Sequence, residues 1–349
     1  MKNKVVYVKT IGTCNLNCDH CFTNGSSGDK TMFNVTDTLA WLSDYTAQVG
    51  RDCDWHVELH GGEPFLVKIP KLTEFTKGLR AILPNVSIGC TSNLTFPLTD
   101  NHLEFIQDEL HGQMGTSWDP HIRWDTPGQY TTWQTSLERL ANIDIYPKVN
   151  VTITKRLIAE YTPKKLIDEL LSVGVRVVEL ERLTMDGSAI CSADGIFPDN
   201  DTQDLWFMDL VEYYQLYDVQ NKLNILTIDN LLSRLQKNLV HTGTNCRNCE
   251  QNLVTINSDG SLATCPNSAT QVNYSSIHDN PEVFLTHDLR VGSQVKEQSW
   301  DERCLKCDVF DLCGGDCHKL NWDNRCSGWK RTLHKLSGRP YVDNLIIKV

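Results

Sequence analysis

The chain of 349 residues is long enough to bury a substantial core, and its length suggests two or three domains. Its formal net charge of −11 disfavours diffuse binding to nucleic-acid backbones, which requires an excess of Lys and Arg. No apolar run approaches the roughly 20 residues that cross a membrane, and the N-terminus lacks a signal-peptide pattern. We therefore expect a cytoplasmic protein with no membrane partner.

Strand-like and helix-like stretches alternate over the first two-thirds of the chain. The expected strands are residues 5–10, 55–60, 86–91, 114–118, 148–154 and 175–181. The expected helices between them are residues 35–42 (a helix start), 71–83, 103–110, 131–143 and 163–173. This alternation predicts right-handed βαβ units and a parallel sheet, either open or closed into a barrel.

The pattern changes after the sixth predicted strand. Residues 187–201 are polar and irregular and are predicted to form a loop, and helices are expected at 202–216 and 229–239. From residue 242 cysteines, Asn, Asp and Gly dominate with few periodic runs, which is typical of a small domain folded around metal. We place the domain boundary near residue 240.

Fourteen cysteines, many of them grouped at gaps of two to five residues, are the most informative feature of the composition. A disulfide framework is the alternative, but such frameworks belong to small chains with weak cores. Close spacing suits a metal, which gathers thiolates from one tight loop. The contest that remains is between zinc and iron–sulfur.

Cys14, Cys18 and Cys21 follow directly on the first predicted strand in the spacing C-x3-C-x2-C. A closed tetrahedral zinc or cluster site needs four ligands, and this loop offers three. A cluster held by three thiolates keeps one iron open to a substrate or cofactor. The alternative is a zinc site that His20 or Cys53 closes as fourth ligand.

A glycine turn, Gly61-Gly62-Glu63-Pro64, follows the second predicted strand about 40 residues after Cys21. Glycine allows a ligand to approach the backbone closely, and Glu63 can accept hydrogen bonds from an ammonium group. The turn is informative because it sits after the second strand of a βα array.

With these two motifs the chain resembles the radical S-adenosylmethionine superfamily. The cysteine loop and the Gly-Gly-Glu-Pro turn match its two best markers, with His20 in the place of its usual aromatic residue. Residues 91–95 (TSNLT) are similar to its "QTNGTL" segment, and residues 116–120 (TSWDP) to its "SLDGP" segment. The resemblance implies an α/β fold, a partial (β/α)6 barrel with the cofactor across the strand ends.

The resemblance also implies roles for individual residues. In that superfamily S-adenosylmethionine chelates the open iron, one electron breaks its S–C5′ bond, and the 5′-deoxyadenosyl radical abstracts a substrate hydrogen. Cys14, Cys18 and Cys21 would ligate the cluster. The implied cofactor contacts are His20, Gly61, Gly62, Glu63, Asn93, Ser117 and Arg123. Arg123 would bind the methionyl carboxylate, with a plain surface arginine as the alternative.

Eight cysteines follow residue 240, enough for two closed four-thiolate sites of zinc or iron–sulfur. Their array resembles the SPASM extension found on one branch of the superfamily, including a strand–turn–strand lead-in over residues 254–265 with an Asp259-Gly260 turn. This resemblance implies two auxiliary clusters and hence three [4Fe–4S] clusters in all. The implied ligand sets are Cys246, Cys249, Cys265 and Cys317, and Cys304, Cys307, Cys313 and Cys326.

The implied domains are a barrel (1–215), a helical linker (216–240), a SPASM domain (241–335) and a C-terminal tail (336–349). Of the other cysteines, Cys53 and Cys90 are expected to be structural. Cys191, in the loop after the sixth strand, is our one candidate for a catalytic residue, whose identity is otherwise unknown. Other candidates to line the pocket are Glu179, Glu181, Asp186 and Tyr213.

Many SPASM-bearing enzymes modify peptides, so we expect an oxidoreductase or maturase that cross-links or otherwise functionalises a peptide or protein side chain. Its electron donor would be a protein such as flavodoxin or ferredoxin. Sulfatase-type oxidation is not expected, because Pro266 follows Cys265 where sulfatase-maturating relatives carry an Asp base. The alternative substrates are a small molecule or a nucleotide-linked amino acid. The alternative of another class is a non-enzymatic multi-zinc protein.

Overall fold

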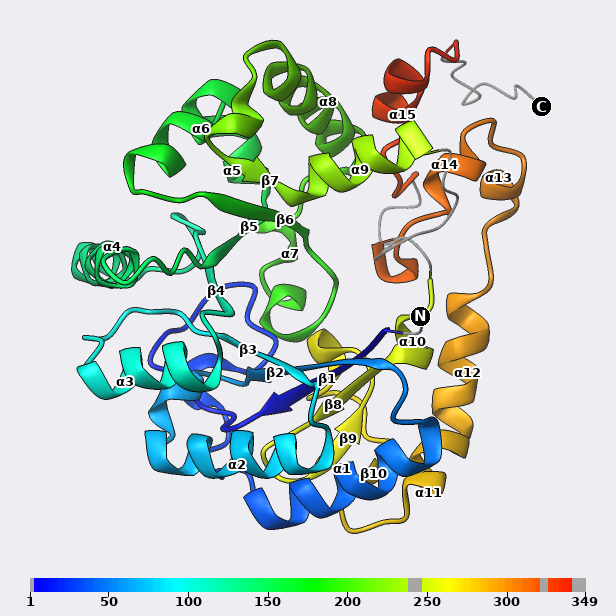
Figure 1. The fold of residues 1–349 in the computed structure, drawn as a ribbon. Coiled ribbons are helices and arrows are strands. Elements are labelled where there is room, and N and C mark those ends of the chain that lie inside the picture. Colours follow the sequence, from blue (N-terminus) through cyan, green and yellow to red (C-terminus); the bar gives the residue numbers. More distant parts are fainter. Residues whose placement is uncertain (1–2, 238–246, 321–325, 341–349) are drawn as a thin grey trace.

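A ten-stranded sheet, in the order β10-β9-β8-β1-β2-β3-β4-β5-β6-β7, runs through the computed structural model, which describes residues 3–237, 247–320 and 326–340. The six central strands are β1 (Asn3–Lys9), β2 (Asp54–His60), β3 (Ser87–Thr91), β4 (Met114–Ser117), β5 (Lys148–Ile153) and β6 (Val177–Arg182). Each pairs in parallel with the next. The predicted parallel sheet is therefore confirmed (Figure 1).

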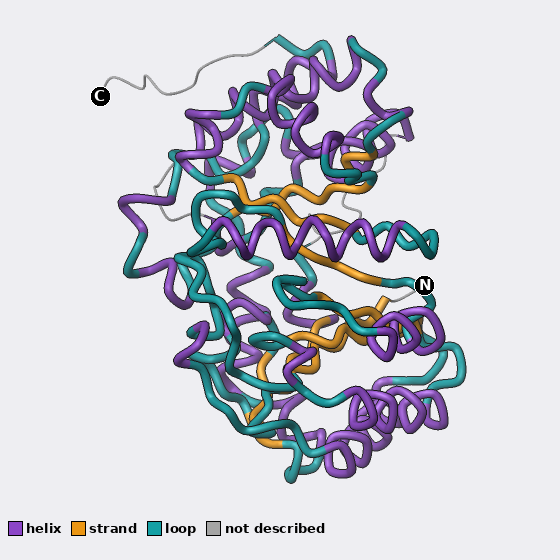
Figure 2. Tube along the Cα trace, turned by 90° about the vertical axis from the view of Figure 1, so that its left-hand side faces the viewer, coloured by secondary structure: helices purple, strands orange, loops and turns teal. Residues whose placement is uncertain are grey.

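Helices surround the strands and connect successive ones (Figure 2). They are α1 (Val35–Val49), α2 (Ile69–Ile82), α3 (Asp100–Glu104), α4 (Pro127–Ala141), α5 (Lys155–Glu160), α6 (Pro163–Ser172), α7 (Ala193–Ile196), α8 (Asn200–Leu216) and α9 (Leu226–Lys237). Side-chain caps fix several starts: Asn34 accepts a hydrogen bond from the Asp37 amide, and Asp199 accepts one from the Thr202 amide. Such caps satisfy amides that the first helical turn leaves without partners.

Alternation along the strands separates an apolar layer from a polar interior. Val6 and Val8 of β1 are fully buried, while Tyr7 between them lines a cavity inside the barrel. In β2, Val57 and Leu59 are likewise buried. Successive side chains of a strand point to opposite faces. The apolar face therefore packs under the helices, and the other face supplies the walls of the cavity.

Several short elements differ from the sequence-based expectation. Residues 187–201, predicted to be a loop, contain a 3-10 turn, Gly187–Ile190, and the short helix α7. Strand β7 (Asn224–Ile225) pairs with β6 and was not expected, and the helix predicted over 103–110 is split into α3 and a π-helical turn, Phe105–Glu109. Elements this short carry no readable periodicity, so contacts with the rest of the fold determine them.

The cysteine-rich part of the chain is joined to the same sheet. Strand β8 (Leu253–Ile256) pairs in parallel with β1, and β9 (Ser261–Ala263) returns antiparallel to β8. The predicted hairpin turn is confirmed: Gly260 has a φ of +85°, and the Ser261 amide donates to Asp259. The remaining elements are β10 (Ser275–Ser276), α10 (Cys249–Asn252), α11 (Pro281–Thr286), α12 (Asp288–Glu297), α13 (Glu302–Leu305), α14 (Phe310–Cys313) and α15 (Lys330–Ser337).

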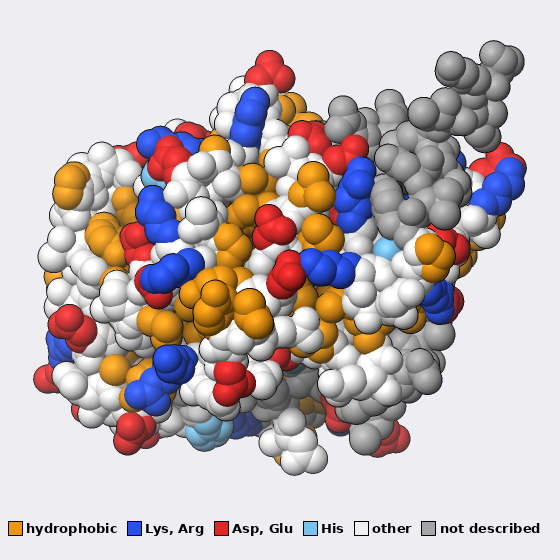
Figure 3. All heavy atoms as spheres, turned by 90° about the horizontal axis from the view of Figure 1, so that it is seen from above, with side chains coloured by type: hydrophobic (Ala, Val, Ile, Leu, Met, Phe, Trp, Pro, Cys, Tyr) orange, Lys and Arg blue, Asp and Glu red, His pale blue; other side chains and the backbone are white. Residues whose placement is uncertain are grey.

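The predicted domain boundary near residue 240 and the end of the helix predicted to reach 239 lie outside the described residues. No helix among the described residues is both long and apolar enough to cross a membrane. On the face shown in Figure 3, Lys and Arg side chains are interspersed with Asp and Glu around hydrophobic ones.

Candidate active site

The loop that follows β1 places its three cysteines on one wall of the cavity inside the barrel. The thiols of Cys14, Cys18 and Cys21 interact electrostatically with one another, and all three line the barrel cavity. The Leu16 amide donates to Cys14 Sγ at 3.4 Å, and the Gly25 amide donates to Cys21 Sγ at 3.3 Å. Amide donors of this kind stabilise cluster-bound thiolates and tune the reduction potential of the cluster.

Burial keeps the thiols of Cys14 and Cys18 neutral unless a cation joins them. It raises the pKa of Cys14 to about 11 and that of Cys18 to about 12. A metal ligand must be a thiolate, and a bound metal ion supplies the charge that ionises it. Three thiols that ionise on a bound cation can hold a metal centre, and the set is compatible with an iron–sulfur cluster that keeps one iron open. Among the described residues, no three His, Cys, Asp or Glu side chains converge closely enough to hold a single metal ion.

The glycine turn after β2 packs against the cysteine loop through its backbone. The Gly62 amide donates to the Ile11 carbonyl at 2.8 Å, and the Glu63 amide donates to the Thr13 carbonyl at 3.1 Å. A Cβ at Gly62 would lie 1.9 Å from the Thr13 oxygen, and one at Gly61, whose φ is +139°, would lie 2.3 Å from the Ile11 oxygen. Both glycines line the cavity, but the structure also requires them for this close approach, a role that the sequence did not indicate.

Glu63 anchors the segment after β3. Its fully buried carboxylate accepts hydrogen bonds from the amides of Phe65 (3.1 Å) and Asn93 (2.8 Å) and from the Ser92 hydroxyl (2.8 Å). Burial raises the pKa of Glu63 to about 7, against the lowering effect of these donors. The carboxylate lies behind the cavity wall, and its predicted contact with an ammonium group stays a prediction.

Asn93 and Ser117 both line the cavity. The side-chain Nδ2 of Asn93 donates to Asn15 Oδ1 at 2.7 Å and to Cys14 Sγ at 3.4 Å, which ties the end of β3 to the cysteine loop. Ser117 is the last residue of β4 and is 9% exposed. The C-terminal ends of parallel strands therefore supply both side chains, as is usual for sites in folds of this class.

Arg123 lies in the site and not on the surface. Its Nε and Nη2 donate to Asp119 Oδ2 at 2.9 and 2.8 Å, and it lines the cavity. Asp119 is buried and accepts the Thr152 amide at 2.7 Å, and His20 Nε2 lies 3.8 Å from the same carboxylate. The alternative of a surface arginine is therefore wrong. His20 is neutral at physiological pH, because burial lowers its pKa to about 4.

The Arg123–Asp119 pair gives a testable stability effect. We expect Asp119→Ala to destabilise the fold by about 3–5 kcal/mol, because it leaves the buried Arg123 charge without its partner. Denaturant unfolding at neutral pH measures this difference. Asp125→Ala, at an exposed position two residues beyond Arg123, is the matched control and should be nearly silent. Equal midpoints for the two variants would contradict the assignment.

The sign of the pH dependence follows from the same pair. Burial alone would raise the pKa of Asp119, but the Arg123 guanidinium and the hydrogen bond from the Thr152 amide outweigh it, so the pKa lies below its ordinary 3.8. A lowered carboxyl pKa stabilises the folded state above 3.8, and this contribution is lost as the pH falls through the folded-state value. The effect of Asp119→Ala should therefore be complete at pH 7.

The cavity has a volume of about 650 Å³ and extends from the cysteine loop into the barrel. Its inner walls are polar: Tyr7, Glu58, Lys148 and Glu181 all line it, and Glu58 pairs with His56 at 2.9 Å. Burial raises the pKa of Glu181. Such a lining suits a ligand rich in hydrogen-bonding groups, within the range of about 300–1,000 Å³ typical of ligand sites.

Of the other residues expected at the pocket, Glu181 and Asp186 line the cavity. Glu179 instead accepts a hydrogen bond from Thr227 Oγ1 at 3.0 Å, and the Tyr213 ring packs against Tyr217. The structure does not bring Cys191 to the cavity either. It is exposed and lines a separate hollow of about 360 Å³ together with residues such as Asp19 and His121.

Cys191 lies elsewhere because the segment before it turns along the cysteine loop: the Ser188 amide donates to the Cys21 carbonyl at 2.7 Å. Cys90 is fully buried and Cys53 packs against the hydrophobic core, so both occupy structural positions. Cys53 therefore does not join the three-cysteine loop as a fourth ligand.

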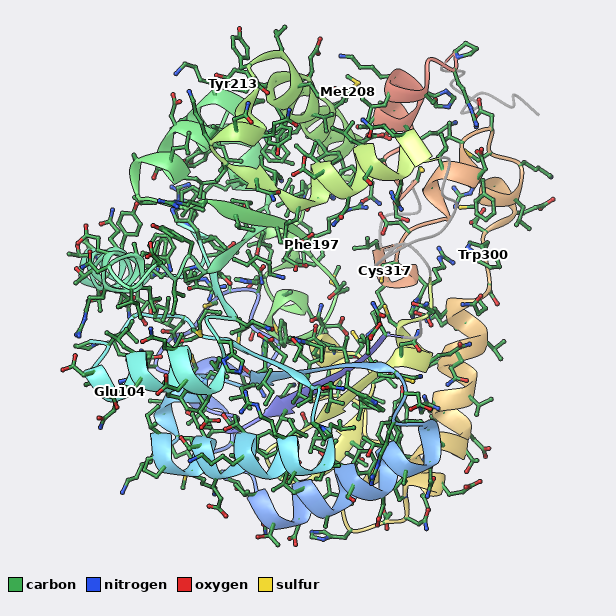
Figure 4. The ribbon with its side chains drawn as sticks, viewed as in Figure 1. Glu104, Phe197, Met208, Tyr213, Trp300 and Cys317 are labelled. Atoms are coloured by element: carbon green, nitrogen blue, oxygen red, sulfur yellow. The ribbon has the colours of Figure 1, made fainter. Side chains whose placement is uncertain are left out.

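The described C-terminal cysteines fall into two sets. The thiols of Cys249, Cys265 and Cys317 interact electrostatically with one another, and Cys246, which the sequence assigns to the same set, lies outside the described residues. Burial raises the pKa of Cys249 and Cys317 to about 12. Cys317 lies on the side of the C-terminal segment that faces the barrel, and Trp300 lies on its outer side (Figure 4).

The second set comprises the four cysteines that the sequence groups together: Cys304, Cys307, Cys313 and Cys326. Gly328 packs against it, since a Cβ there would lie 2.4 Å from Cys313 Sγ. Arg247 braces the loop between the two sets, donating to the carbonyls of Gly315 (2.6 Å) and Asp316 (2.5 Å). The grouping agrees with the implied ligand sets, while ligation itself stays a prediction.

Comparison with known proteins gives a family match and a fold match. The family described as a 4Fe-4S single cluster domain matches residues 4–114, which include the cysteine loop, the glycine turn and Asn93. No curated protein matches the sequence. The structure is similar to that of anSMEcpe with bound AdoMet and Cp18Cys peptide, with a TM-score of 0.74 and 15% identity over 96% of this chain and 95% of that chain.

A second similar structure is SuiB of Streptococcus suis bound to S-adenosylmethionine, with a TM-score of 0.62 and 13% identity over 93% of this chain and 76% of that chain. SuiB bound to its precursor peptide SuiA gives a TM-score of 0.61 at 13% identity, over 95% of this chain and 76% of that chain. The shared fold therefore spans both the barrel and the cysteine-rich C-terminal part.

Proposed function

Because this chain has the fold of the radical S-adenosylmethionine superfamily with a SPASM-type extension, we propose that it is an enzyme that cleaves S-adenosylmethionine reductively and abstracts a hydrogen atom from its substrate. The observation that carries the proposal is the set of three cysteines on the wall of a cavity of about 650 Å³. A closed structural site would need a fourth ligand in this set. The set instead faces space that a cofactor and a substrate can occupy.

In this proposal Cys14, Cys18 and Cys21 hold one [4Fe–4S] cluster. Together with bound S-adenosylmethionine, that cluster supplies a 5′-deoxyadenosyl radical. The residues proposed to surround S-adenosylmethionine are His20, Gly61, Gly62, Glu63, Asn93, Ser117 and Arg123. Among the described residues Arg123 uses Nε and Nη2 for Asp119, which leaves Nη1 for the methionyl carboxylate.

The chain's own contribution is to position the reactants and to exclude water. Asn93 fixes the cysteine loop through Asn15 and Cys14, and Glu63 in turn fixes Asn93. Asp119 holds the Arg123 guanidinium in one orientation. Groups held rigidly in this way do not have to reorganise when the cofactor and the substrate meet.

The C-terminal sets are proposed to hold two auxiliary [4Fe–4S] clusters, the first with Cys246, Cys249, Cys265 and Cys317 and the second with Cys304, Cys307, Cys313 and Cys326. Full ligation by thiolates makes such clusters electron carriers and poor substrate binders. We propose that they accept an electron from the substrate radical that hydrogen abstraction leaves, and that a protein such as flavodoxin or ferredoxin reduces the enzyme in the cytoplasm, where thiols stay reduced.

The substrate that we propose first is a peptide or protein side chain, with a cross-link or another C–H functionalisation as the product. The support is that two similar structures, anSMEcpe and SuiB, hold peptides. A small polar substrate is the second candidate. The observation in its favour is the charged inner wall of the cavity, where Glu58, Lys148 and Glu181 would contact a substrate that enters the barrel.

Anaerobic purification followed by iron, sulfide and zinc analysis tests the proposal. We expect a brown protein with about twelve irons per chain, as three four-iron clusters require. After reduction it should convert S-adenosylmethionine to 5′-deoxyadenosine, measured by chromatography. A colourless protein that carries only zinc would establish the multi-zinc alternative in place of the enzyme.

A further inference from the structure

Lys9, the last residue of β1, carries a buried ammonium group that no described residue hydrogen-bonds. Its side chain is 2% exposed, and its Nζ has no hydrogen-bond partner among the described residues. Its ring contact is with Phe22, whose centroid lies 5.8 Å from Nζ. Burial lowers the pKa of Lys9 to about 8. A buried cation without a partner is costly, so its presence calls for a counter-charge.

The Lys9 ammonium group lies near two of the three cysteine sets. Phe22 directly follows Cys21, and the Phe22 carbonyl accepts a hydrogen bond from Thr270 Oγ1 at 3.0 Å. Phe22 thereby joins the first cysteine loop to the segment that follows Cys265. The charges that act on Lys9 are those of Cys21, Cys265 and Asp259. Lys9 therefore lies between the first cysteine set and the auxiliary set of Cys249, Cys265 and Cys317.

The carboxylate whose charge acts on Lys9, that of Asp259, already accepts hydrogen bonds from another residue. Asp259 is exposed at the β8–β9 turn, where its Oδ1 accepts hydrogen bonds from the Ser261 amide and hydroxyl at 2.9 and 2.7 Å. The ring of His60 stacks on Phe22. His60 is neutral, because burial lowers its pKa to about 4. The counter-charge that fits the Lys9 ammonium is therefore that of metal-bound thiolates at Cys21 and Cys265.

We propose that Lys9 is a shared counter-cation for the first cluster and for the auxiliary cluster that includes Cys265, and that it raises the reduction potential of both. The inference rests on the proposed function, since it takes the two clusters as present. A fixed positive charge favours the more negative, reduced state of each cluster. Lys9 thus acts on the potentials of the two clusters through its charge, without contacting the substrate.

Redox titration followed by electron paramagnetic resonance tests this proposal on the full chain, with no substrate required. In Lys9→Met we expect unchanged contents of iron and sulfide. The midpoint potentials of two clusters should shift to more negative values. The shift should change the oxidised-to-reduced ratio of each cluster at a given potential at least about tenfold, which corresponds to 59 mV for one electron. Lys9→Arg keeps the charge and should restore both midpoints. The third cluster, held by the set that includes Cys313, should not shift.

Lys165→Met is the matched control, because it removes another lysine that lies over an aromatic ring, with Nζ 4.2 Å from the Tyr161 centroid, but on the exposed surface of α6. Its midpoints should equal those of the wild type. Full iron with unchanged midpoints in Lys9→Met would overturn the inference and leave the proposed function intact. Loss of iron in both Lys9→Met and Lys9→Arg would also overturn the inference, because the shape of the side chain and not its charge would then decide whether the clusters assemble. Loss of iron in Lys9→Met alone would support the inference.

Discussion

Replacing Cys14, Cys18 and Cys21 together with Ala is expected to abolish 5′-deoxyadenosine formation and to leave about eight irons per chain. The expectation follows because the cysteines fall into three separate sets. The three thiols of this loop interact electrostatically with one another and lie on the cavity wall. The two C-terminal sets keep their own thiols in such a variant. Iron analysis and chromatography of the reduced reaction measure the two quantities.

The matched control for the cysteine variant is Cys191→Ala, since Cys191 is exposed and lies away from the cavity. It should keep about twelve irons and full cofactor cleavage. Survival of 5′-deoxyadenosine formation in the triple variant would show that the open iron is elsewhere. Loss of activity in Cys191→Ala would instead return that residue to the list of catalytic candidates.

Gly62→Ala is expected to prevent the first cluster from assembling while the auxiliary clusters remain. A methyl group at this position would lie 1.9 Å from the Thr13 carbonyl oxygen and 2.8 Å from the Cys14 nitrogen, so the glycine turn and the cysteine loop must separate. Overpacking against backbone destabilises by about 3 kcal/mol or more, because no side chain can move aside. The measurement is iron content and 5′-deoxyadenosine formation, with the denaturant midpoint beside them.

The control for this substitution is Gly292→Ala in α12, where an added Cβ meets nothing within 4 Å. Replacing glycine by alanine in an unobstructed helix is neutral or stabilising by about 1 kcal/mol. If Gly62→Ala behaved like Gly292→Ala, the close packing of the turn on the loop would not matter for cluster assembly. A parallel loss in both variants would point to a general effect on folding.

The structure also changes the part that Glu63 plays. From the sequence it was a carboxylate for a ligand's ammonium group, but its oxygens already accept hydrogen bonds from Phe65, Ser92 and Asn93. Two of these donors lie 29 and 30 residues further along the chain. Glu63 thus supports Ser92 and Asn93, which line the cavity, and sequence spacing alone could not reveal these long-range partners.

Much of the fold was readable from the sequence because it depends on local patterns. Alternating strand and helix signals gave the six parallel strands, and Asp259-Gly260 gave the β8–β9 turn, since glycine there adopts a φ of +85°. The short elements were missed: β7 has two residues and α7 has four. Segments of that length show no period of their own, and their neighbours in the fold decide their conformation.

The sequence by itself determined how the cysteines are grouped, because spacing within a loop is a local property: three thiols follow β1 and eight follow residue 240. Only the tertiary structure decided which distant groups meet. It brought the Thr152 amide to Asp119, moved Cys191 away from the cavity, and buried Lys9 between two cysteine sets. Burial and unlike-charge contact arise when strands far apart in the chain come together, and no local pattern records them.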